Sequence, residues 1–340
     1  MRDGYPLVEL HRHLDGNVRI ETVLDLARQH GLTLPAWTVE GLRPHVQITE
    51  REPSLMAFIA KFALLKRVMA DYDAVRRIVR ENLEDAAREG IDYIELRFSP
   101  YFMGEEHGLD TAGVVEAACD ALEEARGRIP VKAKLIGIIS RHYGPEIGRV
   151  ELAAAIRGRD RGVVALDLAG DEANFPGELF VRHFQEAREA GLCATVHAGE
   201  AAGAWSVRQA VEELGAERIG HGVRAVEDTA VLELLAERRI ALEVCPTSNL
   251  QTSTVADYRS HPLPALLRRG LAVTLNTDDP SISGIDLAHE YRVAMEELGL
   301  SAAELRRLQE NAVAAAFLTP EERTELLSGY TSSLLERRDS

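Results

Sequence analysis

The feature of this chain that most restricts its fold is a series of short apolar runs that alternate with segments of helical periodicity. Several runs are nearly continuously hydrophobic, as Val163–Leu166 is, which is typical of strands buried on both faces. The alternation predicts parallel β-strands joined by crossover helices. The runs number eight, the number of strands that closes a (β/α)8 barrel. They are Leu7–His13, Tyr93–Phe98, Lys132–Ile139, Val163–Leu168, Ala194–His197, Arg218–His221, Ile240–Cys245 and Ala272–Asn276.

The predicted fold class is therefore α/β, a (β/α)8 TIM barrel, with an open doubly wound sheet as the alternative. No linker or low-complexity stretch separates a second domain, so residues 1–340 are predicted to form one barrel domain. Between the runs, apolar side chains recur at helical spacing, as they do from Val75 to Leu83. For that helix the sequence predicts a cap at Asp73 and an end at Gly90.

Additional helical sequence separates the first two runs. Residues 50–90 exceed what one crossover needs. The first part, Leu55–Met69, is apolar on much of its surface, which fits a helix over the barrel mouth and equally a helix that faces the core. The charged tail Ser301–Arg338 is predicted to add an outer helical layer.

Composition excludes several classes of protein. The sequence contains no run of about 18 apolar residues that would predict a membrane span, and the N-terminus lacks a secretory signal. We therefore expect a cytoplasmic protein. The three cysteines are far apart and lack a Cys-x-x-Cys pair, which argues against disulfides and against a thiolate zinc site. A net charge of −16 disfavours nucleic acid as a partner and favours a small-molecule substrate.

The first run ends in a potential metal-binding motif. His11, His13 and Asp15 alternate along the predicted strand, so their side chains share one face. Two imidazoles and a carboxylate are costly to bury unless a divalent metal binds them.

Polar residues also follow the other predicted strands. Because barrel active sites lie at the C-terminal ends of the strands, we expect these residues to meet. Four of the eleven histidines of the chain lie at such ends. The polar ends are Arg97–Pro100, Asp167–Glu172, His197–Glu200, Gly220–Gly222, Cys245–Asn249 and Asn276–Pro280.

His11, His13 and His197, together with one aspartate of the Asp278–Asp279 pair, form a nitrogen and oxygen donor set suited to zinc. Zinc lowers the pKa of a bound water from about 15.7 to about 7. Neighbouring side chains in an extended segment point in different directions, so only one aspartate is expected to be a ligand. The spacing does not say which.

Three further residues are candidates beside this set. Glu200 follows the ligand His197 by three residues, as a proton donor or acceptor would, although an acid there also suits a helix N-terminus. His221 lies between two glycines and fits a base, a charge stabiliser or a buried structural histidine. Gly170 offers a bare backbone N–H to a ligand, or is an ordinary turn glycine.

Four motifs in this order, His-x-His-Leu-Asp-Gly, His-Ala-Gly-Glu, Gly-His-Gly and Thr-Asp-Asp-Pro, resemble the adenosine deaminase family, and its bacterial members in particular. The resemblance extends from Leu7 to about Leu326. It implies a zinc-dependent (β/α)8 hydrolase of the amidohydrolase group that converts adenosine to inosine, in purine salvage. It also implies one zinc ion per subunit, with His11, His13, His197 and Asp278 as the ligands.

The resemblance also implies roles toward the purine. Glu200 would donate a proton to N1, and His221 would activate or orient the attacking water. Asp279 would hydrogen-bond to N7, and the backbone N–H of Gly170 would meet N3.

Asp15 would bind the ribose 5′-hydroxyl, and His13 would also border the substrate. Relatives that act on free adenine or other aminopurines more often carry glutamate at the position of Asp15, so this residue favours adenosine and 2′-deoxyadenosine. A deaminase of adenine or of another 6-aminopurine is the alternative enzyme. A non-catalytic metal- or purine-binding protein is disfavoured, because binding alone would need neither Glu200 nor His221. The sequence does not predict the oligomeric state.

Overall fold

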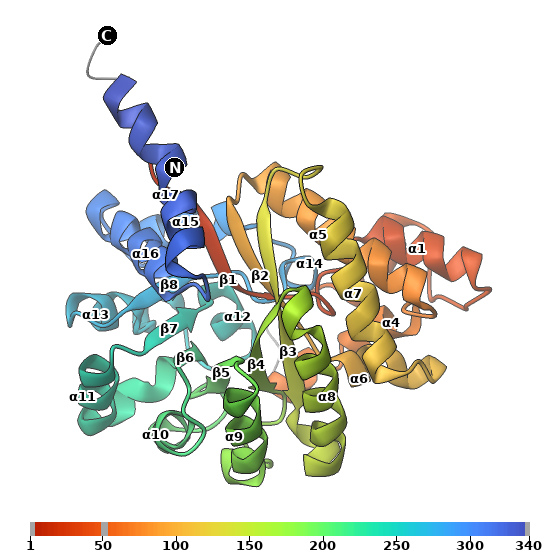
Figure 1. The fold of residues 1–340 in the computed structure, drawn as a ribbon, viewed down its shortest axis with the longest axis horizontal. Helices are drawn as coiled ribbons and strands as arrows, with labels where there is room; N and C mark the ends of the chain where they lie inside the picture. Colours follow the sequence, from red (N-terminus) through yellow and green to blue (C-terminus); the bar gives the residue numbers. More distant parts are fainter. Residues whose placement is uncertain (1–3, 49–53, 337–340) are drawn as a thin grey trace.

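The computed structural model of the chain describes residues 4–48 and 54–336, and each of the eight predicted runs matches a β-strand to within one residue at either end (Figure 1). The strands lie in a single sheet, in sequence order, and each one pairs in parallel with the next. They are β1 (Val8–His13), β2 (Tyr93–Phe98), β3 (Lys132–Ser140), β4 (Val163–Ala169), β5 (Cys193–Ala198), β6 (Arg218–His221), β7 (Ala241–Val244) and β8 (Val273–Leu275).

The sheet closes on itself just beyond β8. The backbone N–H of Asp278 donates to the carbonyl of His11 at 2.9 Å, and the N–H of His13 donates to the carbonyl of Asp278 at 2.8 Å. Strand order and closure together confirm the (β/α)8 barrel and rule out the open doubly wound sheet. The closure also places Asp278 directly beside two histidines of β1.

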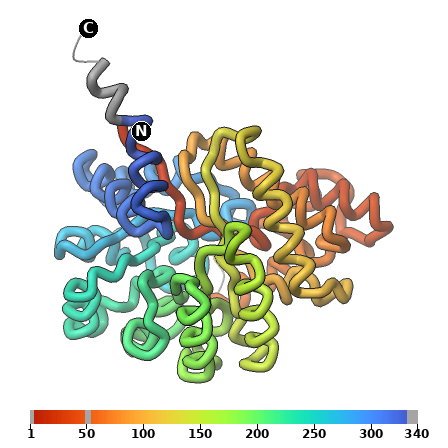
Figure 2. The backbone as a smooth tube through the Cα atoms, in the orientation of Figure 1, coloured from red at the N-terminus to blue at the C-terminus, as the bar shows by residue number. Residues whose placement is uncertain are grey.

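Helices surround the barrel (Figures 1 and 2). None of the described helices is long and apolar enough to cross a bilayer. Between β1 and β2 lie α1 (Ile20–Gln29), α2 (Val39–Val46), α3 (Leu55–Ile59), α4 (Phe62–Arg67) and α5 (Tyr72–Glu89). The later crossovers contain α6 (Pro100–Gly104), α7 (Thr111–Ala125), α8 (Gly144–Gly158), α9 (Val181–Glu189), α10 (Ala204–Glu212), α11 (Thr229–Arg238), α12 (Pro246–Gln251) and α13 (Leu263–Arg268). After β8 follow α14 (Pro280–Ser283), α15 (Leu287–Glu296), α16 (Ala302–Ala315) and α17 (Pro320–Glu336).

Helix α5 shows how the local sequence sets an element, and it corrects one prediction. Its N-cap is Asp71, whose side chain accepts from the N–H of Ala74 at 2.7 Å, and not Asp73. A cap residue needs a non-helical backbone, which Asp71 has at φ −152° and ψ 175°, whereas Asp73 already lies in the first helical turn. Gly90 ends the helix as predicted, at φ 77°.

The barrel interior contains buried charges that the apolar runs did not predict. Arg97 of β2 lies 2.8 Å from Asp167 of β4 and 2.6 Å from Glu243 of β7. Arg218 of β6 binds Glu243 and Glu95. Buried ions persist only when each is paired and hydrogen-bonded, and here each carboxylate bridges several donors.

The end of α16 and the residues before α17 pack at the N-terminal ends of the strands, next to β1 (Figure 2). The guanidinium of Arg218 donates to the carbonyl of Ala315 at 2.9 Å and lies 3.6 Å from the ring centroid of Phe317. The N–H of Phe317 donates to Glu95 at 2.7 Å. These residues therefore cover the charged interior at the N-terminal end of the barrel.

Candidate active site

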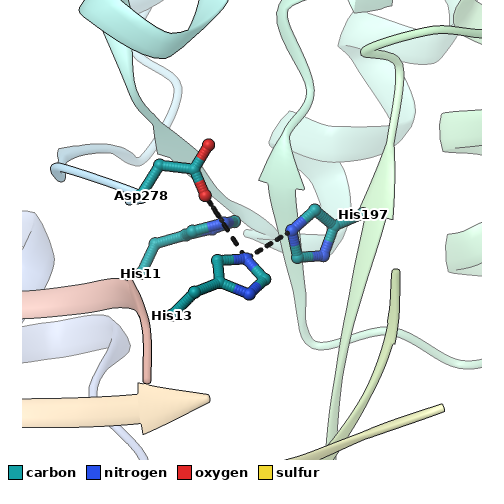
Figure 3. Close-up of side chains that lie close together, drawn as sticks. All are labelled: His11, His13, His197 and Asp278. Atoms are coloured by element: carbon teal, nitrogen blue, oxygen red, sulfur yellow. Dashed lines mark hydrogen bonds and ion pairs between the residues drawn. The ribbon is translucent and has the colours of Figure 1, made fainter. Parts of the chain in front are cut away.

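Three histidines and one aspartate converge at the C-terminal end of the barrel, as Figure 3 shows. His11 and His13 come from β1, His197 comes from β5, and Asp278 follows β8. One donor atom from each lies within 4.8 Å of the others, and all four residues are buried. The Asp278 Oδ1 atom is 3.2 Å from His11 Nε2 and 3.3 Å from His13 Nε2. His13 Nε2 is 3.2 Å from His197 Nε2.

This arrangement fits a metal ion. His11 Nε2 is buried and has no hydrogen-bond partner within the described part of the chain, which is costly for a polar atom unless something else binds it. Three imidazole nitrogens and one carboxylate oxygen are a donor set that zinc commonly takes. Of the two neighbouring aspartates, Asp278 is the one whose carboxylate lies in this cluster. Its backbone lies in the left-handed region at φ 67°, a conformation unusual outside glycine.

Carboxylates behind the cluster orient its imidazole rings. The Nδ1–H of His11 donates to Glu243 at 2.8 Å, and the Nδ1–H of His197 donates to Asp167 at 3.1 Å. Each bond leaves the Nε2 lone pair facing the centre of the cluster. Although burial raises the pKa of Glu243, Arg97 and Arg218 outweigh it and hold this pKa well below its usual value.

The site favours positive charge. Burial lowers the pKa of His197 to about 4, so this ring is neutral. Burial also lowers the pKa of His13, but nearby aspartates, first among them Asp279, outweigh it and raise this pKa to about 9. The carboxylates thus attract a cation to the cluster, and a divalent metal satisfies that demand with more donors than a proton does.

Glu200 lies on the turn after β5, and one carboxylate holds this turn in place. Glu172, from the loop after β4, accepts the backbone N–H groups of four consecutive residues, 199–202, at 2.7 to 3.1 Å. The sequence placed Glu172 at a strand end but assigned it no role. Its partners are backbone groups about 30 residues away, and no side-chain pattern reveals them.

The Glu200 side chain is buried, and its Oε1 has no hydrogen-bond partner among the described residues. Burial, together with the charges of Asp278 and Glu172, raises its pKa well above the usual value. Both effects favour the protonated carboxyl group over the carboxylate. Its Oε2 lies 3.6 Å from Nε2 of His221, the last residue of β6, whose backbone is also left-handed at φ 61°.

A cavity of about 60 Å³ adjoins the cluster. Asp279 lines it with an Oδ1 atom that is buried and unpartnered within the described residues, and Gly170 lines it at φ 98°. Asp15 does not line the cavity. Its Oδ2 accepts from the N–H of Ser99 at 3.1 Å, and its Oδ1 lies 3.6 Å from Nδ1 of His13. The full lining is His13, Leu55, Phe58, Ile59, Phe62, Ala169, Gly170, His197, Glu200, His221, Asp278 and Asp279.

Helices α3 and α4 cover this cavity. Phe58 and Phe62 contribute rings whose centroids lie 6.1 Å apart. The prediction that Leu55–Met69 lies over the barrel mouth is therefore confirmed for its first half. Its last residues, including Met69, are buried in the core, so the core-facing alternative holds for that part. Gly16 packs so closely against Asp279 that a Cβ at position 16 would lie 1.6 Å from Asp279 Oδ1.

A larger cavity, of about 690 Å³, lies at the opposite end of the barrel, where β2 and β3 begin. Lysine and glutamate line it, and none of its lining residues is a histidine. Volume alone therefore does not mark the functional site in this barrel. The converging donors and the buried carboxyl groups do.

Comparison with known sequences agrees with this geometry. The profile of the adenosine deaminase family matches residues 6–332. The chain is 53% identical over 322 residues to an adenosine deaminase of Edwardsiella ictaluri, covering 95% of this chain and 96% of that protein. It is 52% identical over 321 residues to an adenosine deaminase of Escherichia coli, covering 94% and 96%.

Solved structures with the same architecture include deaminases of several purines. An adenine deaminase from Arthrobacter aurescens superposes with a TM-score of 0.89 at 28% identity, covering 97% of this chain and 99% of that one. An N6-mAMP deaminase from Arabidopsis gives 0.85 at 29%, covering 97% and 98%. An amidohydrolase from Burkholderia ambifaria, solved with bound Zn, gives 0.87 at 25%, covering 99% and 92%. The family match over nearly the whole chain and the identities above 50% establish that this chain belongs to the adenosine deaminase family.

Proposed function

We propose that this protein catalyses the hydrolytic deamination of adenosine and 2′-deoxyadenosine, in which water replaces the 6-amino group and ammonia leaves. The observation that carries the proposal is a buried Glu200, with an unpartnered carboxyl oxygen and a raised pKa, in a cavity beside the four-residue cluster. Adenosine is preferred over other aminopurines because the relatives at 52–53% identity are adenosine deaminases, whereas the adenine deaminase matches at 28%. Such a reaction serves purine salvage.

We propose one zinc ion as the cofactor, held by His11, His13, His197 and Asp278. The donor set and the Zn-bound structural neighbour support this choice. When bound, zinc supplies a water molecule that is acidic enough to ionise near neutral pH.

Glu200 provides the acid. A protonated carboxyl group can donate to N1 of the purine, which draws electrons from C6 and makes that carbon more electrophilic. Because the group is held by a turn whose four N–H groups bind Glu172, little motion accompanies the transfer. His221 lies on the other side of the Glu200 carboxyl group, at 3.6 Å, where it orients the attacking water.

Two groups orient the purine ring. N7 and N3 of adenine accept hydrogen bonds, so their partners must be donors. Burial and the neighbouring Asp278 raise the pKa of Asp279 well above its usual value, which favours the protonated form that can donate to N7. The backbone N–H of Gly170, a residue that lines the cavity, is the donor assigned to N3.

We assign recognition of the ribose to Asp15, with His13 bordering the sugar. The unpartnered Oδ1 of Asp15 is available to accept from the 5′-hydroxyl once the cavity opens. At about 60 Å³ the cavity is far smaller than the roughly 300 Å³ of small ligand pockets. Entry of a nucleoside therefore requires α3 and α4 to shift outward.

Steady-state rates, paired with metal analysis, test the proposal. We expect about one zinc ion per chain and similar kcat/KM values for adenosine and 2′-deoxyadenosine, with adenine and N6-methyl-AMP about 100-fold slower or worse. Removing the metal with a chelator should abolish turnover, and adding zinc back should restore it. Preferred turnover of adenine or N6-methyl-AMP would replace the proposed substrate. Bound metal without turnover of any aminopurine would favour a binding protein.

The three cysteines carry no disulfide. This is consistent with the reducing cytoplasm, which we propose as the compartment of the reaction.

A further inference from the structure

His221 is in contact with the site through one ring nitrogen and with a buried amide through the other. Its Nε2 lies 3.6 Å from Glu200 Oε2 and 3.9 Å from Asp278 Oδ2. Its Nδ1 lies 3.0 Å from the side-chain nitrogen of Asn249, on α12. Which ring nitrogen carries the proton decides whether His221 begins the reaction as a hydrogen-bond donor or as a base.

The contact continues away from the site through two more buried groups. Asn249 Oδ1 lies 3.3 Å from Nε2 of His261, and His261 Nδ1 accepts from the backbone N–H of Leu263 at 3.1 Å. His261 lies in the turn between the 3-10 helix η6 (Tyr258–Ser260) and α13. Asn249 and His261 are 0% and 4% exposed, so water does not compete for these bonds.

The bond from the Leu263 N–H to His261 determines which atom donates in each of the other bonds. A backbone N–H can only donate, so His261 Nδ1 must be an acceptor. Burial lowers the pKa of His261 to about 4, so the ring is neutral and its proton is on Nε2. That Nε2–H donates to the oxygen of Asn249, which leaves the amide nitrogen to face His221.

These bonds also determine which nitrogen of His221 carries the proton. The Asn249 amide nitrogen has only N–H groups to offer, so His221 Nδ1 must accept. A proton on Nδ1, in either the other tautomer or the imidazolium, would place two donors against each other at 3.0 Å. The neutral His221 ring therefore carries its proton on Nε2, the nitrogen that faces the site.

We propose that Asn249 and His261 are positioning residues that hold His221 in the Nε2–H tautomer. His221 then begins the cycle as a hydrogen-bond donor that orients the attacking water and stabilises negative charge on it, and not as the base. This inference deepens the proposed deaminase function and rests on it for the catalytic role. The tautomer itself follows from the hydrogen bonds alone.

Nitrogen NMR of the zinc-loaded enzyme, labelled with ¹⁵N-histidine, tests the tautomer directly. We expect His221 to show an unprotonated Nδ1 and a protonated Nε2, with its signals assigned by their loss in His221→Gln. An Nδ1–H tautomer or an imidazolium in the wild-type enzyme would overturn the proposal. This measurement needs no substrate. If the protein deaminates none of the aminopurines, the proposed function is wrong, but the tautomer of His221 can still be measured.

Variants test the relay, which is the series of hydrogen bonds from His261 through Asn249 to His221. His261→Phe removes the donor to Asn249 and frees the amide to rotate, so we expect mixed tautomers of His221 and a kcat about 10- to 100-fold lower with KM little changed. His261→Gln restores a donor and should recover the wild-type tautomer and most of kcat. Asn249→Asp presents only acceptors and should move the proton of His221 to Nδ1, with a larger loss of kcat.

Tyr258→Phe is the matched control, because it removes a hydroxyl in the same turn that bonds Thr247 and not the relay. We expect wild-type spectra and rates from it. If His261→Phe fails to fold, the spectra of Asn249→Asp and His261→Gln still decide the matter. Wild-type tautomer and kcat in Asn249→Asp, or in a folded His261→Phe, would overturn the relay.

Discussion

Glu200 is the residue whose chemistry depends most on its surroundings. A glutamate in water is ionised at neutral pH, but here burial and nearby carboxylates raise its pKa and favour the protonated form. Replacing Glu200 with glutamine keeps the shape and an N–H donor but removes the transferable proton. We expect Glu200→Gln to lower kcat by about 10²- to 10⁴-fold.

Metal content should be unchanged in Glu200→Gln, because Glu200 is not part of the cluster of His11, His13, His197 and Asp278. The measurement is steady-state deamination of adenosine with metal analysis of the same sample. Glu213→Gln, at an exposed position just after α10, serves as the control. Nearly full activity in Glu200→Gln would remove the proton-donor role.

Glu172 holds the turn that presents Glu200. Its two carboxylate oxygens accept from four backbone N–H groups, and a charged acceptor contributes about 1.5–3 kcal/mol per bond. In Glu172→Gln the amide nitrogen faces at least one of these donors. We expect kcat to fall at least about 10-fold and Tm to drop by roughly 2–4 °C for each kcal/mol lost.

Asp171→Asn is the matched control for Glu172, because the Asp171 carboxylate accepts from Asn174 within its own turn. It should retain wild-type kcat and Tm by calorimetry. Equal losses in the two variants would show that the loop, and not the carboxylate of Glu172, supports the site.

At this scale the sequence predicted which residues lie at strand ends but not how they are supported: it placed Asp167 and Glu172 at a strand end without a role, and it did not single out Glu243. The histidines, Asp278 and Glu200 follow recognisable strands. Glu243 and Asp167 had one available signal, an acidic residue inside an otherwise apolar run. Their partners lie on other strands, however, and only barrel closure reveals the pairing.

Among the elements, α3 and α4 act as the outer wall of the cavity. Phe58 on α3 is buried and lines the cavity, whereas Met56 on the same helix is 43% exposed and does not. Removing the Phe58 ring should forfeit about 1.5–3 kcal/mol of apolar contact with a bound nucleoside. Phe58→Ala should therefore raise KM for adenosine by about 10-fold or more, with a smaller change in kcat.

Met56→Ala, measured in the same assay, should leave KM at the wild-type value. If both variants raise KM equally, helix stability and not the cavity wall explains the effect. Circular dichroism of both variants separates these two explanations.

The elements were largely predictable, because apolar runs and helical spacing are local properties of the chain. The one clear error concerns a boundary: Asp73 has the right residue type for a cap, but Asp71 has the non-helical backbone. The two interpretations of Leu55–Met69 were both partly right, since a helix in a crowded crossover buries one end in the core and the other over the site.

For the whole molecule, buried ionisable groups link stability to pH. Glu290 on α15 accepts from the N–H of Thr247 at 3.1 Å, while its other oxygen is buried and unpartnered among the described residues. Burial raises the pKa of Glu290 to about 8, from the usual 4.5. The folded protein therefore holds a proton that the unfolded chain releases between these values, so this group favours folding at low pH and disfavours it above pH 8.

Glu290→Gln removes this titration and keeps an acceptor for Thr247. We expect the Tm of the variant to stay close to wild type near pH 5 and to exceed it increasingly as the pH rises, by about 10 °C at pH 9. Thermal melts at pH 5, 7 and 9 measure the trend, with Glu296→Gln, exposed on the same helix, as the flat control. A Tm difference that does not change with pH would contradict the raised pKa of Glu290.

The cover that residues 315–317 form over the charged interior has a consequence for how this chain is made. Arg218 and Glu95 meet their partners Ala315 and Phe317 only when the last part of the sequence is available. A nascent chain that has just passed Asp278 therefore has all four cluster residues, but nothing yet covers its buried charges. The bonds that close the barrel need no residue beyond Asp278, but the charged interior stays uncovered until residues 315–317 are made. A message cut short before codon 315 should therefore yield an unstable chain that is degraded and not a smaller enzyme.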